Sequence, residues 1–158
     1  MIAVELIGDR ELVARLTAMP GGVRQGVARA ITRLALQTES ITKRKLSGEV
    51  LNVRTGVLRS SVNSRIEEST SSVSATIGTN VKYARIHEFG GVIHIPEIRP
   101  KKARALAFEV GGQTIFRMFA RAHDVHMPER SFLRSALREM TPTIKEELAS
   151  AVKEAVHR

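Results

Sequence analysis

The sequence predicts an α+β fold, in which a small antiparallel sheet packs against one long N-terminal helix and a C-terminal helix. Three observations predict this fold. A long amphipathic segment covers residues 20–46, short β-branched runs fill the middle of the chain, and a second amphipathic segment ends it. A chain of 158 residues can bury a core without disulfides or metals. We therefore expect residues 1–158 to form a single domain.

The N-terminal part begins with a strand and continues with helices. Residues 2–8, IAVELIG, alternate loosely and predict a short first strand. Asp9 is a candidate cap for a short helix over residues 10–19, which ends near Pro20. The long helix follows, from about Pro20 to Leu46. Its apolar stripe spans about 100° of the helix surface and consists of Val23, Val27, Ala30, Ile31, Leu34, Thr38 and Ile41.

The opposite side of this helix is basic. Arg29, Arg33, Lys43 and Arg44 fall together there. The chain has 25 Lys and Arg against 16 Asp and Glu, a net charge of +9. Residues 1–66 hold 11 of the basic and 5 of the acidic groups. This excess favours contact with nucleic acid or an acidic protein surface, and the alternative is a solvated face on a basic protein.

The central part predicts short strands. Residues 47–62 contain two glycines and no helical stripe, so we expect a loop that enters a strand. The runs 62–68 and 72–78 predict two strands around a polar turn. Residues 83–89 predict one short helix that Gly90 and Gly91 end, and residues 92–96 a short strand. Residues 103–110 and 114–121 predict a hairpin around Gly111, Gly112 and Gln113.

The C-terminal part predicts a loop and then helices. Residues 123–129 predict a loop, and a helical turn begins near Ser131. Thr141 is a candidate cap for the last helix, with Pro142 at its first position. The buried stripe expected for this helix is Ile144, Leu148, Ala151, Val152, Ala155 and Val156.

Several classes of protein are disfavoured by what the sequence lacks. The absence of cysteine excludes disulfides, thiolate nucleophiles and cysteine-ligated zinc, and it suits an intracellular chain. The first residues contain no charged region followed by a long apolar run, so we expect no signal peptide. No segment approaches the ~18 uninterrupted apolar residues of a membrane span.

The segment 83–94, YARIHEFGGVIH, has the residue types of a metal or acid–base site. A zincin needs two histidines four apart on one helix. Here His87 and His94 are seven apart, and a glycine pair lies between them. His123 and His126 lie close to acidic residues, but no helical context fixes their geometry. We therefore expect no metal and no cofactor.

No catalytic motif stands out elsewhere. Gly111-Gly112-Gln113 is the tripeptide that release factors use, but a hairpin turn explains it without catalysis. No phosphate-binding loop, dinucleotide fingerprint or nucleophile elbow is present. We therefore expect that the protein is not an enzyme.

Three motifs in a fixed order carry a family resemblance: RTGVLRSSV (54–62), YARIHEFGG (83–91) and MPERSFLRSAL (127–137). In this order, and followed by an amphipathic helix, they resemble the tail-completion, or head–tail joining, proteins of long-tailed bacteriophages. That family typically reads Arg-Thr-Gly-x-Leu, Tyr-Ala-x-x-x-Glu-Phe-Gly and Arg-Pro-Phe-Leu-x-x-Ala-Leu. The likeness covers nearly the whole chain. Ser131 departs from the pattern where the family often has proline, but serine can cap a helix start.

The resemblance implies a non-catalytic subunit that forms a ring, often a hexamer, at the head–tail junction of the virion. The protein would assemble in the host cytoplasm, without membrane or cofactor. Its neighbours would be a head connector or adaptor and a tail terminator or tail-tube protein, and double-stranded DNA would pass through the ring without sequence-specific contact. The positions that match the motifs are Arg54, Thr55, Gly56, Leu58, Tyr83, Glu88, Phe89, Gly90, Phe132 and Leu133.

Each motif then has an expected physical role. Gly56 permits a turn, after which Leu58 returns the chain to the core. Tyr83 and Phe89 anchor the short helix between the sheet and the long helix. Gly90 ends the short helix. Glu88 pairs with an arginine of the first motif, Arg54 or Arg59, either inside the subunit or across a ring interface.

Partner contacts are expected at three places: the loop around Arg54 and Arg59, the hairpin turn with Gly112 and Gln113, and the basic face of the long helix. Three alternatives to a junction protein remain open. A tail terminator would cap the tail tube. A basic nucleic-acid-binding module should show an aromatic stacking platform, but the chain has one Tyr and no Trp. A small ribonuclease would depend on His87.

Overall fold

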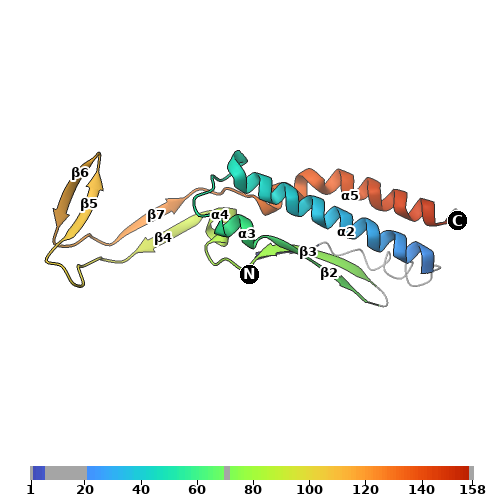
Figure 1. Cartoon of the computed structure of the whole chain (residues 1–158), viewed down its shortest axis with the longest axis horizontal. Helices are drawn as coiled ribbons and strands as arrows, with labels where there is room; N and C mark the ends of the chain where they lie inside the picture. Colours follow the sequence, from blue (N-terminus) through green and yellow to red (C-terminus); the bar gives the residue numbers. More distant parts are fainter. Residues whose placement is uncertain (1, 6–20, 70–71, 157–158) are drawn as a thin grey trace.

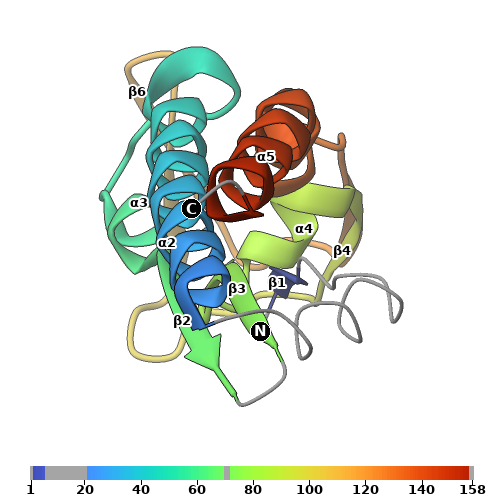
Figure 2. The same ribbon diagram turned by 90° about the vertical axis from the view of Figure 1, so that its right-hand side faces the viewer.

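The computed structural model describes residues 2–5, 21–69 and 72–156. It confirms the α+β fold. Helices α2 (Gly21–Arg44) and α5 (Leu133–Val156) lie side by side over a small antiparallel sheet (Figures 1 and 2). We call these elements the body of the molecule. The short helix expected over residues 10–19 lies outside the described residues.

The sheet of the body has three strands in the order β1-β3-β2, with both pairs antiparallel. These strands are β1 (Ile2–Glu5), β2 (Asn63–Glu68) and β3 (Val73–Thr79). The turn between β2 and β3 is closed by the Ser69 N–H, which donates to the Ser72 carbonyl at 2.8 Å. The first strand and the strand pair around the serine turn are therefore confirmed.

Helix α2 covers the sheet with the predicted stripe. Every stripe residue from Val23 to Ile41 is buried or half-buried. Thr38 is tolerated in the core because its hydroxyl donates to the Leu34 carbonyl at 2.8 Å. Beyond Arg44 the chain makes a π-helical turn (Lys45–Glu49), which contains Gly48 with φ 127°.

Two apolar clusters hold the body together. The larger lies between α2, the sheet and the start of α5, and it contains Ala35, Leu46, Val62, Ala75, Ile77, Ala84, Phe132 and Leu133. The smaller lies between the two long helices and contains Leu34, Met140 and Ile144. Each fully buried aliphatic or aromatic side chain contributes about 1.5–3 kcal/mol.

Helix α5 is one helix, so the prediction of a separate last helix that begins at Thr141 and Pro142 is wrong. Thr141 does not cap, because its hydroxyl donates to the Leu137 carbonyl at 2.7 Å. Proline removes one backbone hydrogen bond, but Met140 and Ile144 on either side of it pack against Leu34 in one cluster. Packing therefore keeps the helix continuous. Ile144 is buried, and Leu148, Ala151 and Val152 are half-buried.

Two segments predicted as loops are regular elements. Residues 57–61 form the short helix α3 (Val57–Ser61), which follows Gly56 at φ 76°. Five residues are too few to show a helical stripe. Residues 123–127 form strand β7 (His123–Met127), which pairs with β4 (Gly91–Ile95). A hydrophobicity pattern does not reveal this strand, because three of its residues are polar and exposed: His123, Asp124 and His126.

An extended arm projects from the body (Figure 1). It consists of the β4–β7 ladder, the bridge between Ile98 and Ala120, and the hairpin of β5 (Leu106–Val110) and β6 (Gln113–Arg117). Gly111 and Gly112 both have positive φ, 59° and 79°, as a two-residue hairpin turn requires. The hairpin is confirmed. The strands form three separate ladders rather than one small sheet.

Candidate functional site

The second and third motifs meet at Glu88, at the end of α4 (Ala84–Phe89). The residue is fully buried. Its carboxylate accepts hydrogen bonds from the backbone N–H groups of Phe132 (2.8 Å), Leu133 (2.9 Å) and Arg134 (2.9 Å), and from the Ser131 hydroxyl (2.7 Å). The first N–H groups of a helix have no partner within it. Glu88 therefore caps α5 from a position 44 residues before Phe132.

Arg134 closes this site from the solvent side. Its guanidinium donates to the Glu88 carboxylate at 3.2 Å, to the Glu88 backbone carbonyl at 2.8 Å and to Glu129 at 2.9 Å. It also lies 4.5 Å from the centre of the Phe89 ring. Burial raises the pKa of Glu88, but the hydrogen bonds from Arg134, Leu133, Ser131 and Phe132 outweigh burial and lower the pKa overall. The carboxylate is therefore charged at neutral pH.

This geometry corrects three expectations. Glu88 pairs with Arg134, not with Arg54 or Arg59, because the start of α5 lies beside it. Ser131 does not cap by accepting a helix N–H, since its hydroxyl donates to Glu88. Tyr83 and Phe89 do not anchor α4, because they are 45% and 50% exposed.

The side chains that anchor α4 and the start of α5 in the core are either small or belong to the third motif. Ala84 on α4 is fully buried, and Phe132 just before α5 is the largest fully buried side chain among the described residues. Leu133 belongs to the same cluster. Large apolar side chains in a chain with few aromatic residues suggest anchors, but the buried face of α4 consists of Ala84 and Glu88, four residues apart.

Gly90 ends α4, as expected, and has no room for a side chain. Its φ is 67°, and a Cβ placed on it would lie 2.8 Å from the Glu129 nitrogen and 2.9 Å from the Met127 carbonyl oxygen. Gly112 also has positive φ, but nothing lies within 4 Å of its Cβ position. Gly90 therefore combines positive φ with a steric contact, whereas Gly112 has positive φ without one.

We expect Gly90→Ala to destabilise the protein more than Gly112→Ala does. Backbone with positive φ costs either alanine about 1–3 kcal/mol. Gly90→Ala must also displace backbone atoms beside the Glu88 cap. Urea unfolding followed by circular dichroism measures both variants. Equal losses of stability would show that the close backbone approach at Gly90 is unimportant.

The first and second motifs meet in a groove of about 660 Å³, which we call the arginine groove. Leu46, Leu51 and Leu58 are buried or packed against the core and form its apolar floor. Its exposed rim contains Val53, Arg54, Arg59, Tyr83 and Arg130. As expected, Gly56 makes a turn and Leu58 returns the chain to the core. The arginine groove therefore combines apolar surface with positive charge.

The arginines on the rim of the arginine groove have no counter-charge within the described residues. No described carboxylate lies within ion-pair distance of Arg54, Arg59 or Arg130. The His87 ring contacts Tyr83 edge-on at 6.0 Å, and its buried Nδ1 has no hydrogen-bond partner in the described part of the chain. Burial lowers the pKa of His87, and the charge of Arg130 lowers it further. His87 is therefore neutral at pH 7.

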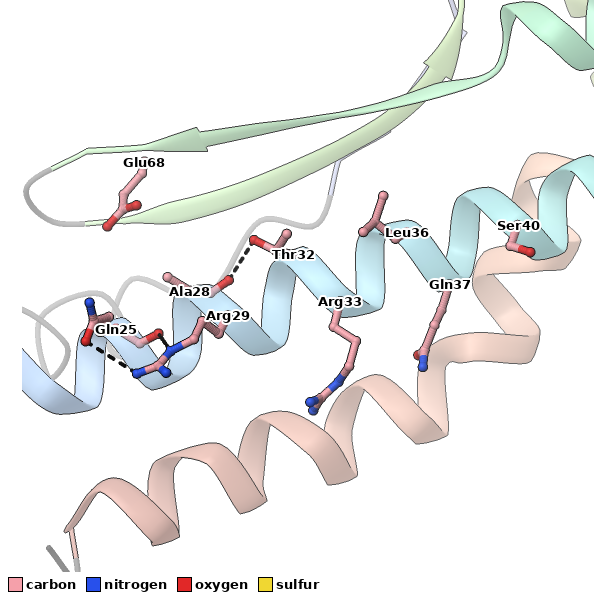
Figure 3. Close-up of a pocket in the computed structure, with 9 residues that line it drawn as sticks. All are labelled: Gln25, Ala28, Arg29, Thr32, Arg33, Leu36, Gln37, Ser40 and Glu68. Carbon is pink, nitrogen blue, oxygen red and sulfur yellow. Dashed lines mark hydrogen bonds between the residues drawn. The ribbon is translucent and has the colours of Figure 1, made fainter.

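The basic residues of α2 are arranged differently from the single basic face that the sequence predicts. Arg33 pairs with Glu147 of α5, Arg44 with Glu139 of α5 at 2.9 Å, and Lys43 with Glu39 at 2.6 Å. Arg29 bonds Gln25 at 3.3 Å. Figure 3 shows a shallow groove along α2, with Arg33 directed toward α5. Three of the four cations are thus paired inside the chain rather than presented together.

The other histidines lie on the arm. His94 of β4 and Asp124 of β7 bond each other at 2.7 Å in an exposed position. Among residues 2–5, 21–69 and 72–156, no three His, Asp or Glu side chains are placed to hold a metal ion. In the same residues no helix is long and apolar enough to cross a membrane.

The arm exposes apolar side chains along its length. Phe108, Phe116 and Phe119 are 38%, 65% and 43% exposed, and they are three of the five phenylalanines of the chain. Val110 and Met118 are exposed as well. A two-stranded hairpin is only marginally stable by itself in water. Exposed apolar surface is typical of sites that contact another molecule.

Comparison with known proteins identifies the family. A model of the phage virion morphogenesis family matches residues 30–157. The chain belongs to the phage virion morphogenesis family. No curated protein and no solved structure matches it significantly. The matched region contains all three motifs, the arm and all of α5, so this virion morphogenesis protein carries its family likeness in both body and arm.

Sequence reasoning missed several residues that the structure brings to these sites in the virion morphogenesis protein. Arg134 completes the Glu88 site, and Arg130 lies on the rim of the arginine groove. Both belong to the third motif, where an arginine on each side of SFL was the available signal. The sequence pattern places Phe108 and Phe116 in strands but assigns them no partner role. These side chains are exposed because the hairpin is separate from the body. A local sequence pattern does not reveal that separation.

Proposed function

We propose that the protein is a structural, non-catalytic subunit of the virion that forms a ring at the head–tail junction. The ring completes the tail and joins it to the head, and DNA passes through it. The exposed apolar arm is the observation that carries this proposal. Membership of a phage virion family supports it.

The arm supports assembly because the body is complete without it. The two apolar clusters of the body contain no residue of β5 or β6. The hairpin strands make their main contacts with each other. An arm that leaves its own body and exposes phenylalanine side chains gains stability when it lies on a neighbour. Repeated head-to-tail contacts of this kind close into a ring when the rotation between copies fits, and a hexamer is the copy number we expect.

The motif residues also support a structural role. Glu88 caps α5, Gly90 permits a close backbone approach, and Phe132 fills the core. The neighbours we propose are a head connector or adaptor on one side and a tail terminator or tail-tube protein on the other. Contact with DNA would be non-specific and salt-sensitive. The pairing of Arg33, Lys43 and Arg44 with carboxylates gives little support to a dedicated nucleic-acid module.

Deletion of the gene in the phage or prophage that carries it tests this function. Negative-stain electron microscopy of the lysate should show DNA-filled heads separate from finished tails. Complementation with the intact gene should restore joined particles. Intact virions from the deletion strain would contradict the proposal, and tails of abnormal length would move the role to termination of the tail tube.

A further inference from the structure

We propose that the arginine groove of one copy receives the hairpin tip of the next copy in the ring. Phe116 would lie on the apolar floor, and the Glu109 carboxylate would bind the arginines of the rim. This inference rests on the proposed ring and names the contact that builds it.

The donor surface is one face of the hairpin. In the β5–β6 register, Ala107 pairs with Phe116 and Glu109 pairs with Thr114. Because cross-strand partners point to the same side and successive residues alternate, these four side chains share a face. Phe116 is 65% exposed, and Glu109 is exposed with no partner among the described residues. The tip therefore offers an aromatic ring and a carboxylate together.

The receptor surface has the matching chemistry. Leu51 and Leu58 supply an apolar floor for an aromatic ring, and a volume of about 660 Å³ accommodates a large side chain with its neighbours. Guanidinium groups bind carboxylates through paired, charge-assisted hydrogen bonds. Within the described part of the chain, Arg54, Arg59 and Arg130 have no counter-charge. A neighbouring carboxylate would supply it.

Charge and shape favour the tip over other occupants. Glu109 is the acidic residue of the hairpin, whereas Lys101, Lys102 and Arg104 precede β5 and would repel the rim. A DNA backbone could neutralise the arginines but has no apolar group for the floor, and a duplex is too wide to enter a groove of this size. The arm extends away from its own body (Figure 1), which leaves its tip free to contact another copy.

Donor and receptor are different surfaces of one chain, so the contact is heterologous. Such a contact repeats from copy to copy and closes into a ring or continues as a filament. A contact between two identical surfaces would stop at a dimer. The size distribution of cross-linked products therefore distinguishes the two.

The absence of cysteine makes a cross-linking test specific. Thr114→Cys places a thiol on the donor face, and Val53→Cys places one on the groove rim, without removing Phe116, Glu109 or an arginine. A short bismaleimide added to particles assembled in infected cells should give a ladder of covalent dimers, trimers and larger products up to the ring. The control pair is Thr114→Cys with Ser150→Cys, an exposed position on α5, and it should give no ladder. No ladder from the first pair, in particles that contain the protein, would overturn the proposal.

Charge reversal gives a second, independent test. Arg54→Glu combined with Arg59→Glu should lower infectivity in complementation at least about tenfold, as should Glu109→Arg, and the triple variant should recover most of the loss. Lys145→Glu, an exposed reversal on α5, is the control. If removal of the hairpin abolishes joining but charge reversal has no effect, the ring function stands and this receptor is wrong. If the deletion strain makes intact virions, the proposed function itself fails.

Discussion

Replacement of Glu88 by alanine is expected to lower the free energy of unfolding by about 3–5 kcal/mol, the usual cost of breaking a buried ion pair. The change leaves three N–H groups at the start of α5 without their acceptor and removes one of the two counter-charges of Arg134. Urea unfolding followed by circular dichroism measures the loss. Glu129→Ala is the matched control, because Glu129 also binds Arg134 but is exposed, and it should cost at most about 1 kcal/mol.

The same carboxylate makes stability depend on acid. Its folded pKa lies below the ordinary value of 4.5, so its contribution is fully present above that value and is lost as pH falls through the lower folded pKa. Glu88→Gln should therefore be less stable than the native protein at pH 7, with the difference shrinking below pH 4.5. Glu39 also has a lowered pKa, so part of the acid sensitivity should persist. A constant difference between the two proteins down to the acid limb would contradict a charged cap.

Replacement of both Phe108 and Phe116 by serine is expected to abolish assembly while the body stays folded. Both rings are exposed in the free chain, so their loss should leave thermal unfolding nearly unchanged. Buried aromatic anchors of an interface each contribute about 2–4 kcal/mol, which corresponds to roughly 30- to 1,000-fold in association. Complementation of a deletion strain, with particles counted by electron microscopy, measures the effect.

The control for the phenylalanine variant is Leu36→Ser. Leu36 is 58% exposed on α2, and it belongs to the body rather than the arm. This variant should complement normally. If the double phenylalanine variant also complemented normally, the arm would not be an assembly surface.

The large elements could be predicted from the sequence because their signals are local. The stripe of α2 repeats over several turns, and the glycine pair at 111–112 specifies a hairpin turn. The start of α5 could not be predicted in this way, because Thr141 and Pro142 resemble the beginning of a helix. Only the packing of Met140 and Ile144 shows that the helix continues through them. Strand β7 carries mostly polar side chains, so hydrophobic alternation could not reveal it.

The candidate sites were predicted in part. The motif residues do gather around α4, but their partners depend on contacts between distant segments. The cap of α5 is supplied by Glu88, which no pattern near the helix start could indicate. The basic residues of α2 share one side of a helical projection, yet the neighbouring α5 supplies carboxylates to Arg33 and Arg44. The role of the arm follows from its separation from the body, which is a property of the whole fold.

We propose that copies of this chain form a ring at the head–tail junction through their arms. An averaged electron-microscopy reconstruction of that junction, from particles that carry the native protein, tests it most directly. We predict a closed ring in which each arm lies on the body of the next copy, with its tip at the arginine groove. A junction that lacks this chain, or a ring whose arms contact no neighbouring copy, would contradict this proposal.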